Sequence, residues 1–422
     1  MPKRKCSQAF NCPKAILPSS GADPVETTQF SQLPGSAPQG GPTTGAGPLT
    51  RPVVVALSHH PAPYRDPTFQ EVHARGNMRL VVILLRRIPH NHSYWDLDDF
   101  CYPSILMEDT AGPARVASLV SQLARLSPSA IVVPGHSGAL IRAALLYAMA
   151  ARVPVVYSAD TISEESNSSP IRRLAKRAML GFLSLSCPAF WVPGRASRDY
   201  LISSGVAADR VFEGYYCLDQ RQVRQDFEAA LAERAVLRAN LGFAPDEFVF
   251  LMVGEMLPFR GVSRLVKVFA RLGRPSTGLL VVGGGAEAKR VREMVRGSNA
   301  HVCLAEPVAF RQLARYYAVA DSYVHPGHEP YSLALMQAAL CGLSIVATPN
   351  VGAASDVLVD GASGLVVPEF DEDALSAAIT ALASEPKRSR DMGSEAQRMA
   401  SVRTTAWAAT QLESAVRHAL HG

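Results

Sequence analysis

Residues 325–348 read HPGHEPYSLALMQAALCGLSIVAT, and this stretch decides the fold. A strand is expected to end near His325, and a second strand to occupy residues 344–348. Between them, Ser332 is a residue type that caps helix starts, and Gly342 is a type that follows helix ends. The stretch therefore predicts a strand–loop–helix–strand unit of a parallel α/β sheet.

Glu329 falls in the loop of this unit, just before the helix, and Gln337 lies about one turn further on. The unpaired N–H groups and the partial positive charge of a helix start suit a diphosphate. The residues alone leave two interpretations open: a phosphate-binding turn, or an ordinary unit whose glutamate is a solvated loop residue.

Strand-like and helix-like segments alternate along the rest of the chain, in two series. Alternation of this kind predicts parallel sheets with helices on both faces. The expected strands are residues 52–57, 80–85, 130–133, 153–157, 190–192, 247–254, 279–282, 301–304, 322–325 and 344–348, and helices are expected over residues 114–126 and 140–151, among others.

The two series divide the chain into parts. Residues 1–50 are rich in Gly, Pro, Ser, Thr and Gln, so they bury too little apolar surface to offset their ordering entropy and are expected to be disordered. Ligands of open parallel sheets bind beyond the carboxyl ends of the strands, which predicts a central cleft between two Rossmann-like lobes. The expected parts are the tail (1–50), a first lobe (51–217), a charged interdomain connection (218–246), a second lobe (247–403) and a final segment (404–422).

The composition excludes several classes of protein. A net charge of +5 with a pI of about 8.8 is too diffuse to indicate nucleic-acid binding. Seven cysteines without a CxxC pair indicate reduced thiols rather than a disulfide framework. No apolar run reaches the roughly 18 residues of a membrane span, and the N-terminus lacks the apolar core of a secretory signal, so a cytoplasmic protein is expected.

The quoted stretch resembles the donor-site signature of retaining GT-B glycosyltransferases of family 4, the glycosyl transferases group 1. Members show E-[GP]-[FY]-[GS]-L followed by E-A-[ML]-A-C-G-x-P-V-[VI]-A. Here Glu329 begins EPYSL, and Gln337 begins QAALCGLSIVA. Further matches in order are VGEMLPFRG (253–261), GGG (283–285), GAASD (352–356) and DGASGLVVP (360–368).

The resemblance implies roles for several residues of the second lobe. Glu329 would face the anomeric carbon of the transferred sugar, Gln337 would bind ribose hydroxyls, and Arg260 would grip the diphosphate. The backbone N–H groups of Ser332 and Leu333 would approach the phosphates. Gly254 and Tyr331 are assigned to the same donor site, and the last segment of the chain is expected to return to the first lobe as a helix.

Two residues of the second lobe depart from the family pattern. Gln337 is neutral where members usually have a carboxylate, and Glu255 stands where many have a second phosphate-binding arginine. A carboxylate beside a diphosphate is repulsive, so Glu255 is expected either to turn away or to mark a weaker site.

The first lobe supplies two further candidates. His136 follows an expected strand within PGHSG and occupies the position of a donor-contacting histidine, which gives it a catalytic or a structural role. Arg65, in a P-x-P-Y-R turn, is expected to face the cleft, with a rigid surface turn as the alternative. His59, His60, His325 and His328 are weaker candidates. No HExxH or DxD spacing is present, so neither a metal nor a cofactor is expected.

Residues 170–183 combine four basic residues with an apolar stripe. Such a helix either rests on an anionic lipid surface, which would suit a lipid-linked acceptor, or packs its stripe on its own sheet.

The resemblance implies a metal-independent, retaining glycosyltransferase that uses a nucleotide-sugar donor and a glycan or lipid-linked acceptor in glycan, polysaccharide or glycolipid synthesis. The alternative is a catalytically impaired GT-B domain that binds sugar nucleotides in a regulatory role, which Gln337 and Glu255 favour.

Overall fold

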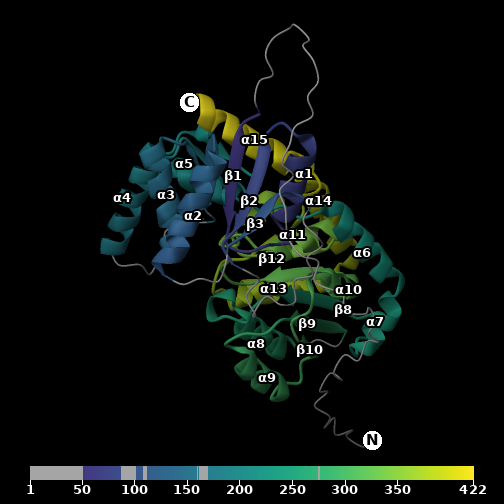
Figure 1. Ribbon diagram of the computed structural model, residues 1–422. Coiled ribbons are helices and arrows are strands. Elements are labelled where there is room, and N and C mark those ends of the chain that lie inside the picture. The colour runs from purple at the N-terminus through teal and green to yellow at the C-terminus, as the bar shows by residue number, and fades with distance from the viewer. Residues whose placement is uncertain (1–50, 87–100, 108–111, 159, 161–169, 274–275) are drawn as a thin grey trace, which may run out of the picture. The chain divides into compact units, whose positions relative to one another are not determined.

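The computed structural model describes residues 51–86, 101–107, 112–158, 160, 170–273 and 276–422. Within them the chain forms two parallel sheets, each flanked by helices, which confirms the predicted GT-B fold class. The expected tail, residues 1–50, lies outside the described residues. Figure 1 shows the elements in chain order.

The first sheet has the strand order β3-β2-β1-β4-β5-β6-β7, and all its pairs are parallel. Its strands are β1 (Val53–Ser58), β2 (Arg79–Leu84), β3 (Ser104–Leu106), β4 (Ala130–Pro134), β5 (Val155–Ser158), β6 (Ala189–Trp191) and β7 (Val211–Phe212). The helices beside it are α1 (Asp66–Arg75), α2 (Pro113–Leu126), α3 (Ala139–Ala151), α4 (Pro170–Ser186) and α5 (Arg195–Ser203). We call these elements the first lobe.

The second sheet has the order β10-β9-β8-β11-β12-β13 and is also parallel throughout. Its strands are β8 (Phe248–Val253), β9 (Thr277–Val282), β10 (Val302–Ala305), β11 (Ser322–His325), β12 (Ser344–Ala347) and β13 (Gly364–Val366). The helices of this second lobe are α6 (Gln220–Ala232), α7 (Arg234–Asn240), α8 (Val262–Leu272), α9 (Ala288–Arg296), α10 (Leu313–Val319), α11 (Leu333–Leu340), α12 (Ala354–Val357), α13 (Glu372–Ser384) and α14 (Pro386–Ala400).

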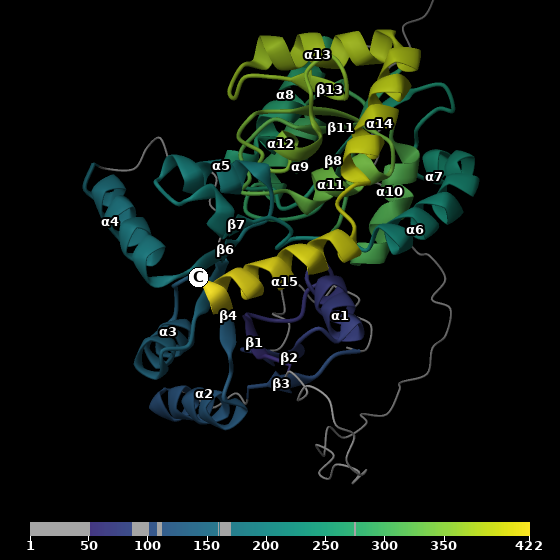
Figure 2. The ribbon, with the colours of Figure 1, turned by 90° about the horizontal axis from the view of Figure 1, so that it is seen from above.

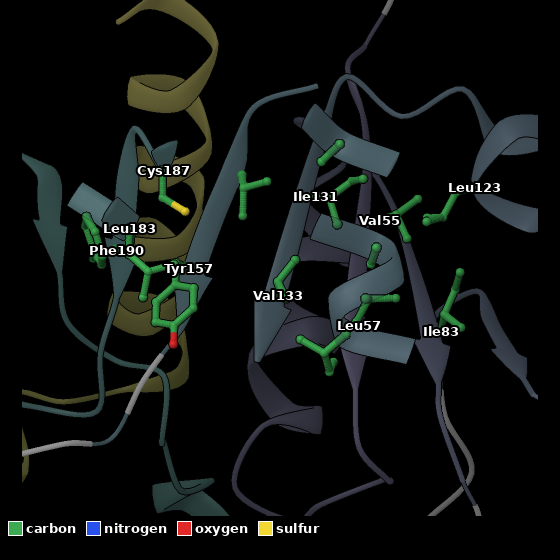
Figure 3. Close-up of a cluster of buried hydrophobic side chains, with 14 of the residues drawn as sticks. Val55, Leu57, Ile83, Leu123, Ile131, Val133, Tyr157, Leu183, Cys187 and Phe190 are labelled. Atoms are coloured by element: carbon green, nitrogen blue, oxygen red, sulfur yellow. The ribbon is translucent and has the colours of Figure 1, made fainter. Parts of the chain in front are cut away.

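Alternation along the strands explains why the apolar runs are continuous. In β1, Val55 and Leu57 pack into one buried cluster and Val54 and Ala56 into another, on the opposite face of the sheet. Figure 3 shows Val55 and Leu57 beside residues of neighbouring strands, under the helices of that face. Each buried aliphatic side chain of this size contributes about 1.5–3 kcal/mol, so both faces of the sheet must be covered by helices.

The last helix, α15 (Thr405–His421), covers the second of these faces. Its side chains Leu412 and Val416 lie in the same cluster as Phe69 of α1 and Val54 of β1. Figure 2 shows α15 beside α1, and α2, α3 and α4 together elsewhere on the first lobe. In the expected interdomain connection, α6 and α7 pack against α10 of the second lobe. The exact part boundaries stay predictions.

All the expected strands are present, with small shifts of their ends. Three strands were not expected: β3, β7 and β13. Each is only two or three residues long, so none contains an apolar run long enough to stand out in the sequence.

Candidate donor site at the ends of β8 and β11

The loop that carries Glu329 is fixed by backbone hydrogen bonds on both sides. The Glu329 N–H donates to the carbonyl of Asn350 over 3.1 Å, and the N–H of Gly352 donates to the Glu329 carbonyl over 2.9 Å. Downstream, Ser332 caps α11 as expected: its hydroxyl accepts from the N–H of Leu335 over 3.4 Å. The loop is therefore held like a short strand between β11 and α11.

The carboxylate of Glu329 has a cationic partner on one oxygen and an imidazole on the other. Arg260 Nη2 lies 2.7 Å from Oε1, and His325 Nε2 lies 3.0 Å from Oε2. Burial alone would raise the pKa of Glu329, but the hydrogen bond from His325 and the charge of Arg260 outweigh it, so this pKa is lowered. Glu329 is therefore ionised at neutral pH and acts only as an acceptor.

Arg260 reaches Glu329 because Gly254 leaves room for its guanidinium. Gly254 ends β8 with a φ of 143°, and a Cβ there would lie 2.4 Å from Arg260 Nη1. The Nε of Arg260 is buried and has no hydrogen-bond partner among the described residues. An arginine with an unused buried donor fits an anionic ligand that the polypeptide itself does not supply.

The start of α11 adds further donors beside Glu329. Ser332 is buried, with a φ of 80°, and α11 begins at Leu333. The first N–H groups of a helix have no acceptor within the helix, and they carry its partial positive charge. The structure thus brings together four of the predicted residues, Glu329, Arg260, Gly254 and Ser332, with Leu333 adjoining.

Glu255, the second departure from the family pattern, has an exposed side chain. The described residues give it no hydrogen bond to Arg260 or to Glu329.

Tyr331 and Gln337 lie elsewhere. The hydroxyl of Tyr331 donates to Asp356 Oδ2 over 3.1 Å, and its ring packs 5.7 Å from that of Tyr216. The Gln337 amide oxygen accepts from the Tyr317 hydroxyl over 3.4 Å. Gln337 also lines a cavity of about 110 Å³ with side chains from α1, α6 and α10, and neither Glu329 nor Arg260 lines that cavity.

The two first-lobe candidates are not brought to Glu329. His136 follows β4 and is exposed, and its Nδ1 lies 2.7 Å from the hydroxyl of Tyr157. The hydroxyl end of Tyr157 projects from the buried cluster in Figure 3.

Arg65 is buried among aromatic side chains rather than on an open wall. It is 3% exposed, donates to the Tyr215 hydroxyl over 2.9 Å, and stacks on the rings of Tyr64 and Tyr215. The expectation that Arg65 faces an open cleft is not met in this conformation, because its guanidinium is enclosed by these rings.

His325 is the functional residue that the sequence analysis undervalued. It is fully buried at the end of β11, and its Nδ1 has no hydrogen-bond partner among the described residues. Its only visible signal is the spacing of four residues before Glu329, which a short loop turns into a direct contact.

Two searches cover the described residues only. They contain no group of three or more His, Cys, Asp or Glu side chains placed to hold a metal ion. None of their helices is long and apolar enough to cross a membrane.

Comparison with known proteins begins with the second lobe. Residues 233–399 match the family described as glycosyl transferases group 1. The D-inositol 3-phosphate glycosyltransferase of Kineococcus radiotolerans is 32% identical over 188 residues, which are 40% of this chain and 43% of that protein. The GDP-mannose-dependent alpha-(1-6)-phosphatidylinositol monomannoside mannosyltransferase of Mycolicibacterium smegmatis is 30% identical over 172 residues, 38% of this chain and 44% of that protein. The chain thus spans less than half the length of these curated relatives.

Solved structures agree over more of the chain. HepE of Anabaena, crystallised with UDP and glucose, superposes with a TM-score of 0.68 at 19% identity, covering 86% of this chain and 98% of that one. WaaG, a glycosyltransferase involved in lipopolysaccharide biosynthesis, gives a TM-score of 0.60 at 17% identity, covering 87% of this chain and all of that one. At these identities the likeness concerns the fold.

Proposed function

We propose that this chain, whose residues 233–399 belong to the glycosyl transferases group 1 family, is a glycosyltransferase that moves a sugar from a nucleotide-sugar donor to an acceptor hydroxyl. The observation that carries the proposal is the carboxylate of Glu329, held ionised between Arg260 and His325 beside a helix start. A buried anion next to cationic and N–H donors suits a substrate that has a diphosphate on one side and a developing positive charge on the other.

In the proposed reaction the bond between the anomeric carbon and the diphosphate oxygen breaks, and its electron pair leaves with the diphosphate. Arg260 and the first N–H groups of α11 would stabilise that negative charge. Glu329 would face the sugar ring as positive charge develops there. The acceptor oxygen then bonds to the anomeric carbon, and its proton passes to the departing phosphate.

We further propose that the anomeric configuration is retained and that no metal ion is needed. Retention is what the family resemblance implies. The support for metal independence is that Arg260 and the α11 start can supply the positive charge that a divalent cation supplies in other transferases.

The relatives suggest which substrates to test first. The names of the two curated relatives specify inositol 3-phosphate and a phosphatidylinositol mannoside as acceptors, and one of them specifies GDP-mannose as donor. The solved structure of HepE holds UDP. We therefore propose an acceptor that is a phosphorylated polyol or glycan, free or linked to lipid.

Helix α4 supports a lipid surface as the place of action. Its inner side chains Leu180 and Leu183 are buried against the first sheet, so its outer stripe has no sheet to cover it. That stripe exposes Ile171 (80%), Leu174 (69%), Phe182 (55%) and Leu185 (90%). The sequence of the helix contains four basic residues and no acidic one. An apolar stripe on a basic helix matches an anionic bilayer surface, and we propose that α4 rests on one.

Flotation with vesicles tests this surface. The chain should float with vesicles of phosphatidylcholine and phosphatidylglycerol, and Leu174→Glu together with Phe182→Glu should abolish flotation. Val236→Glu, at an exposed apolar residue of α7, is the matched control and should float like wild type. Equal flotation of all three proteins would remove α4 from the membrane proposal.

The competing function is a sugar-nucleotide-binding protein without turnover, favoured by the neutral Gln337. Release of nucleoside diphosphate from a panel of UDP-, GDP- and ADP-sugars separates the two, with inositol phosphate or phosphatidylinositol vesicles as acceptors. An enzyme consumes one donor, and consumption accelerates with an acceptor. A binding protein retains affinity without consumption, and a chain that neither binds nor consumes any donor contradicts both functions.

A further inference from the structure

Helix α5 of the first lobe is capped by residues of the second lobe. The residue before the helix is Gly194, which has no side chain to cap it. Instead, the N–H of Arg195 donates to Asp356 Oδ1 over 2.9 Å, and the N–H of Ala196 donates to the Ser355 hydroxyl over 3.0 Å. Free N–H groups at a helix start are normally satisfied locally, so this end of α5 is completed only by α12.

The contact requires a glycine at position 194. A Cβ there would lie 2.2 Å from Asp356 Oδ2 and 2.9 Å from the ring of Tyr331. No side chain fits between α5 and α12, so the two segments meet backbone to carboxylate.

The carboxylate of Asp356 is fully buried and accepts from two further side chains. Arg403 Nη2 donates to Oδ1 over 2.7 Å, and the Tyr331 hydroxyl donates to Oδ2 over 3.1 Å. Arg403 also binds Glu213 of the first lobe over 2.7 Å, and it lies between α14 and α15, where the chain crosses back. One carboxylate thus joins α5, the return crossing and the loop before α11.

That loop is the one that carries Glu329. The N–H of Ala353 donates to the Tyr331 carbonyl over 2.6 Å, and the N–H of Gly352 donates to the Glu329 carbonyl over 2.9 Å. Residues 352–356 therefore grip the Glu329 loop by its backbone while Asp356 grips α5 of the other lobe. A displacement of Asp356 would be transmitted to Glu329 through only a few bonds.

We infer that Asp356 is a positioning residue that couples the docking of α5 to the placement of Glu329. Asp356 touches no reacting atom in this scheme: it acts through Tyr331 and the 352–353 backbone. The consequence for catalysis rests on the proposed function, whereas the mechanical coupling between α5 and the loop does not.

Two variants and one control separate coupling from simple capping. Tyr331→Phe breaks the side-chain link to the Glu329 loop and leaves the cap on α5. Asp356→Asn weakens both the cap and the link. Ser355→Ala removes a cap acceptor but has no contact with Tyr331, so it is the matched control.

Kinetics should divide the three proteins. We expect kcat to fall about tenfold or more in Asp356→Asn and Tyr331→Phe, the scale of losing a hydrogen bond to a buried charge, with donor KM changed less than about threefold. Ser355→Ala should keep the wild-type kcat. Equal kcat values in all four proteins at a temperature where all are folded would overturn the inference.

Hydrogen exchange tests the coupling without any activity. In Asp356→Asn, peptides covering residues 194–198 and peptides covering residues 350–354 should both exchange faster than in wild type. Faster exchange at 194–198 alone would make Asp356 a helix cap and nothing more. Coupled exchange in a protein that transfers no sugar would sustain the coupling and reject the proposed function. If Asp356→Asn does not fold, Tyr331→Phe still decides, because it must speed exchange at 350–354 while sparing 194–198.

Discussion

Two buried carboxylates on strand-to-helix turns, Glu329 before α11 and Asp66 at the start of α1, are treated in opposite ways by their surroundings. Glu329 faces a guanidinium and an imidazole, which lower its pKa. Asp66 accepts from the Tyr102 hydroxyl over 2.9 Å and from the N–H of Ala62 over 3.0 Å. Burial raises the pKa of Asp66 to about 6, although both hydrogen bonds and the charge of Arg65 oppose it.

The difference shows what distinguishes a site from a brace within one fold. Neutral donors satisfy Asp66 and leave nothing unused around it. Around Glu329, a buried Nε of Arg260 and the start of α11 remain available to a ligand. The second lobe therefore presents a prepared charge pair, whereas the carboxylate of the first lobe holds its turn together.

Neutralising the two carboxylates should have unequal effects on turnover. Glu329→Gln is expected to lower sugar transfer at least about a hundredfold without unfolding the protein, because it removes the charge that faces the developing cation. Initial rates of product formation measure this, with the surface change Glu395→Gln as the control. Near wild-type turnover of Glu329→Gln would remove the catalytic role and the contrast with Asp66.

Crowding Arg260 should weaken the same site from a distance. Gly254→Ala places a Cβ 2.4 Å from the Arg260 guanidinium, and we expect about a thirtyfold loss of kcat/KM because small displacements of a catalytic group are costly. Gly273→Ala is the matched control: it also has a positive φ, but nothing lies within 4 Å of its Cβ position. Equal losses in both variants would point to backbone strain rather than to Arg260.

The sequence predicted the fold well because long apolar strands in both sheets are visible as runs. It predicted the Glu329, Arg260 and Gly254 group through the family resemblance, since these residues keep their motif spacing. It did not predict the roles of His325 and Asp356. His325 acts by where β11 ends, and Asp356 meets Arg195 161 positions away in sequence, so neither contact leaves a local pattern.

Arg65 shows the opposite limit. Its turn matched an expected motif, yet the rings that enclose it come from residues 64 and 215. The direction of a side chain on a turn depends on such distant packing, which the sequence alone does not encode in a readable form.

The raised pKa of Asp66 predicts a dependence of stability on pH. The folded protein keeps this proton up to about pH 6, whereas the unfolded chain releases it near 3.8. Asp66 therefore stabilises the fold fully below pH 3.8, and that contribution is lost as the pH rises through 6, by about 1–2 kcal/mol. Urea unfolding at pH 4.5, 5.5 and 7 should show the decline in wild type and a flatter profile in Asp66→Asn. Parallel profiles would show that Asp66 is ionised in the fold.

Gln337 tests whether the donor site extends along α11. If its amide contacts the ribose, Gln337→Ala should weaken donor binding by about 1 kcal/mol, seen in KM rather than kcat. Tyr317→Phe removes the hydroxyl that Gln337 accepts from and controls for lost packing. Identical donor affinities in wild type and Gln337→Ala would confine the site to the ends of β8 and β11.

The smallest expected effect is that of a chelator. Because Arg260 and the α11 start supply positive charge, incubation with EDTA should leave the transfer rate unchanged. Loss of activity with EDTA and recovery with Mg²⁺ or Mn²⁺ would show that the diphosphate is neutralised in another way.

The central claim is that the second lobe holds the donor's diphosphate through Arg260, and calorimetric titration tests it most directly. UDP and GDP would be titrated into wild type, Arg260→Ala and Arg125→Ala, the last being an exposed arginine of α2 in the first lobe. The account predicts that wild type and Arg125→Ala bind one of these nucleotides equally, and that Arg260→Ala binds it at least about tenfold more weakly. The same affinity in all three proteins would contradict it.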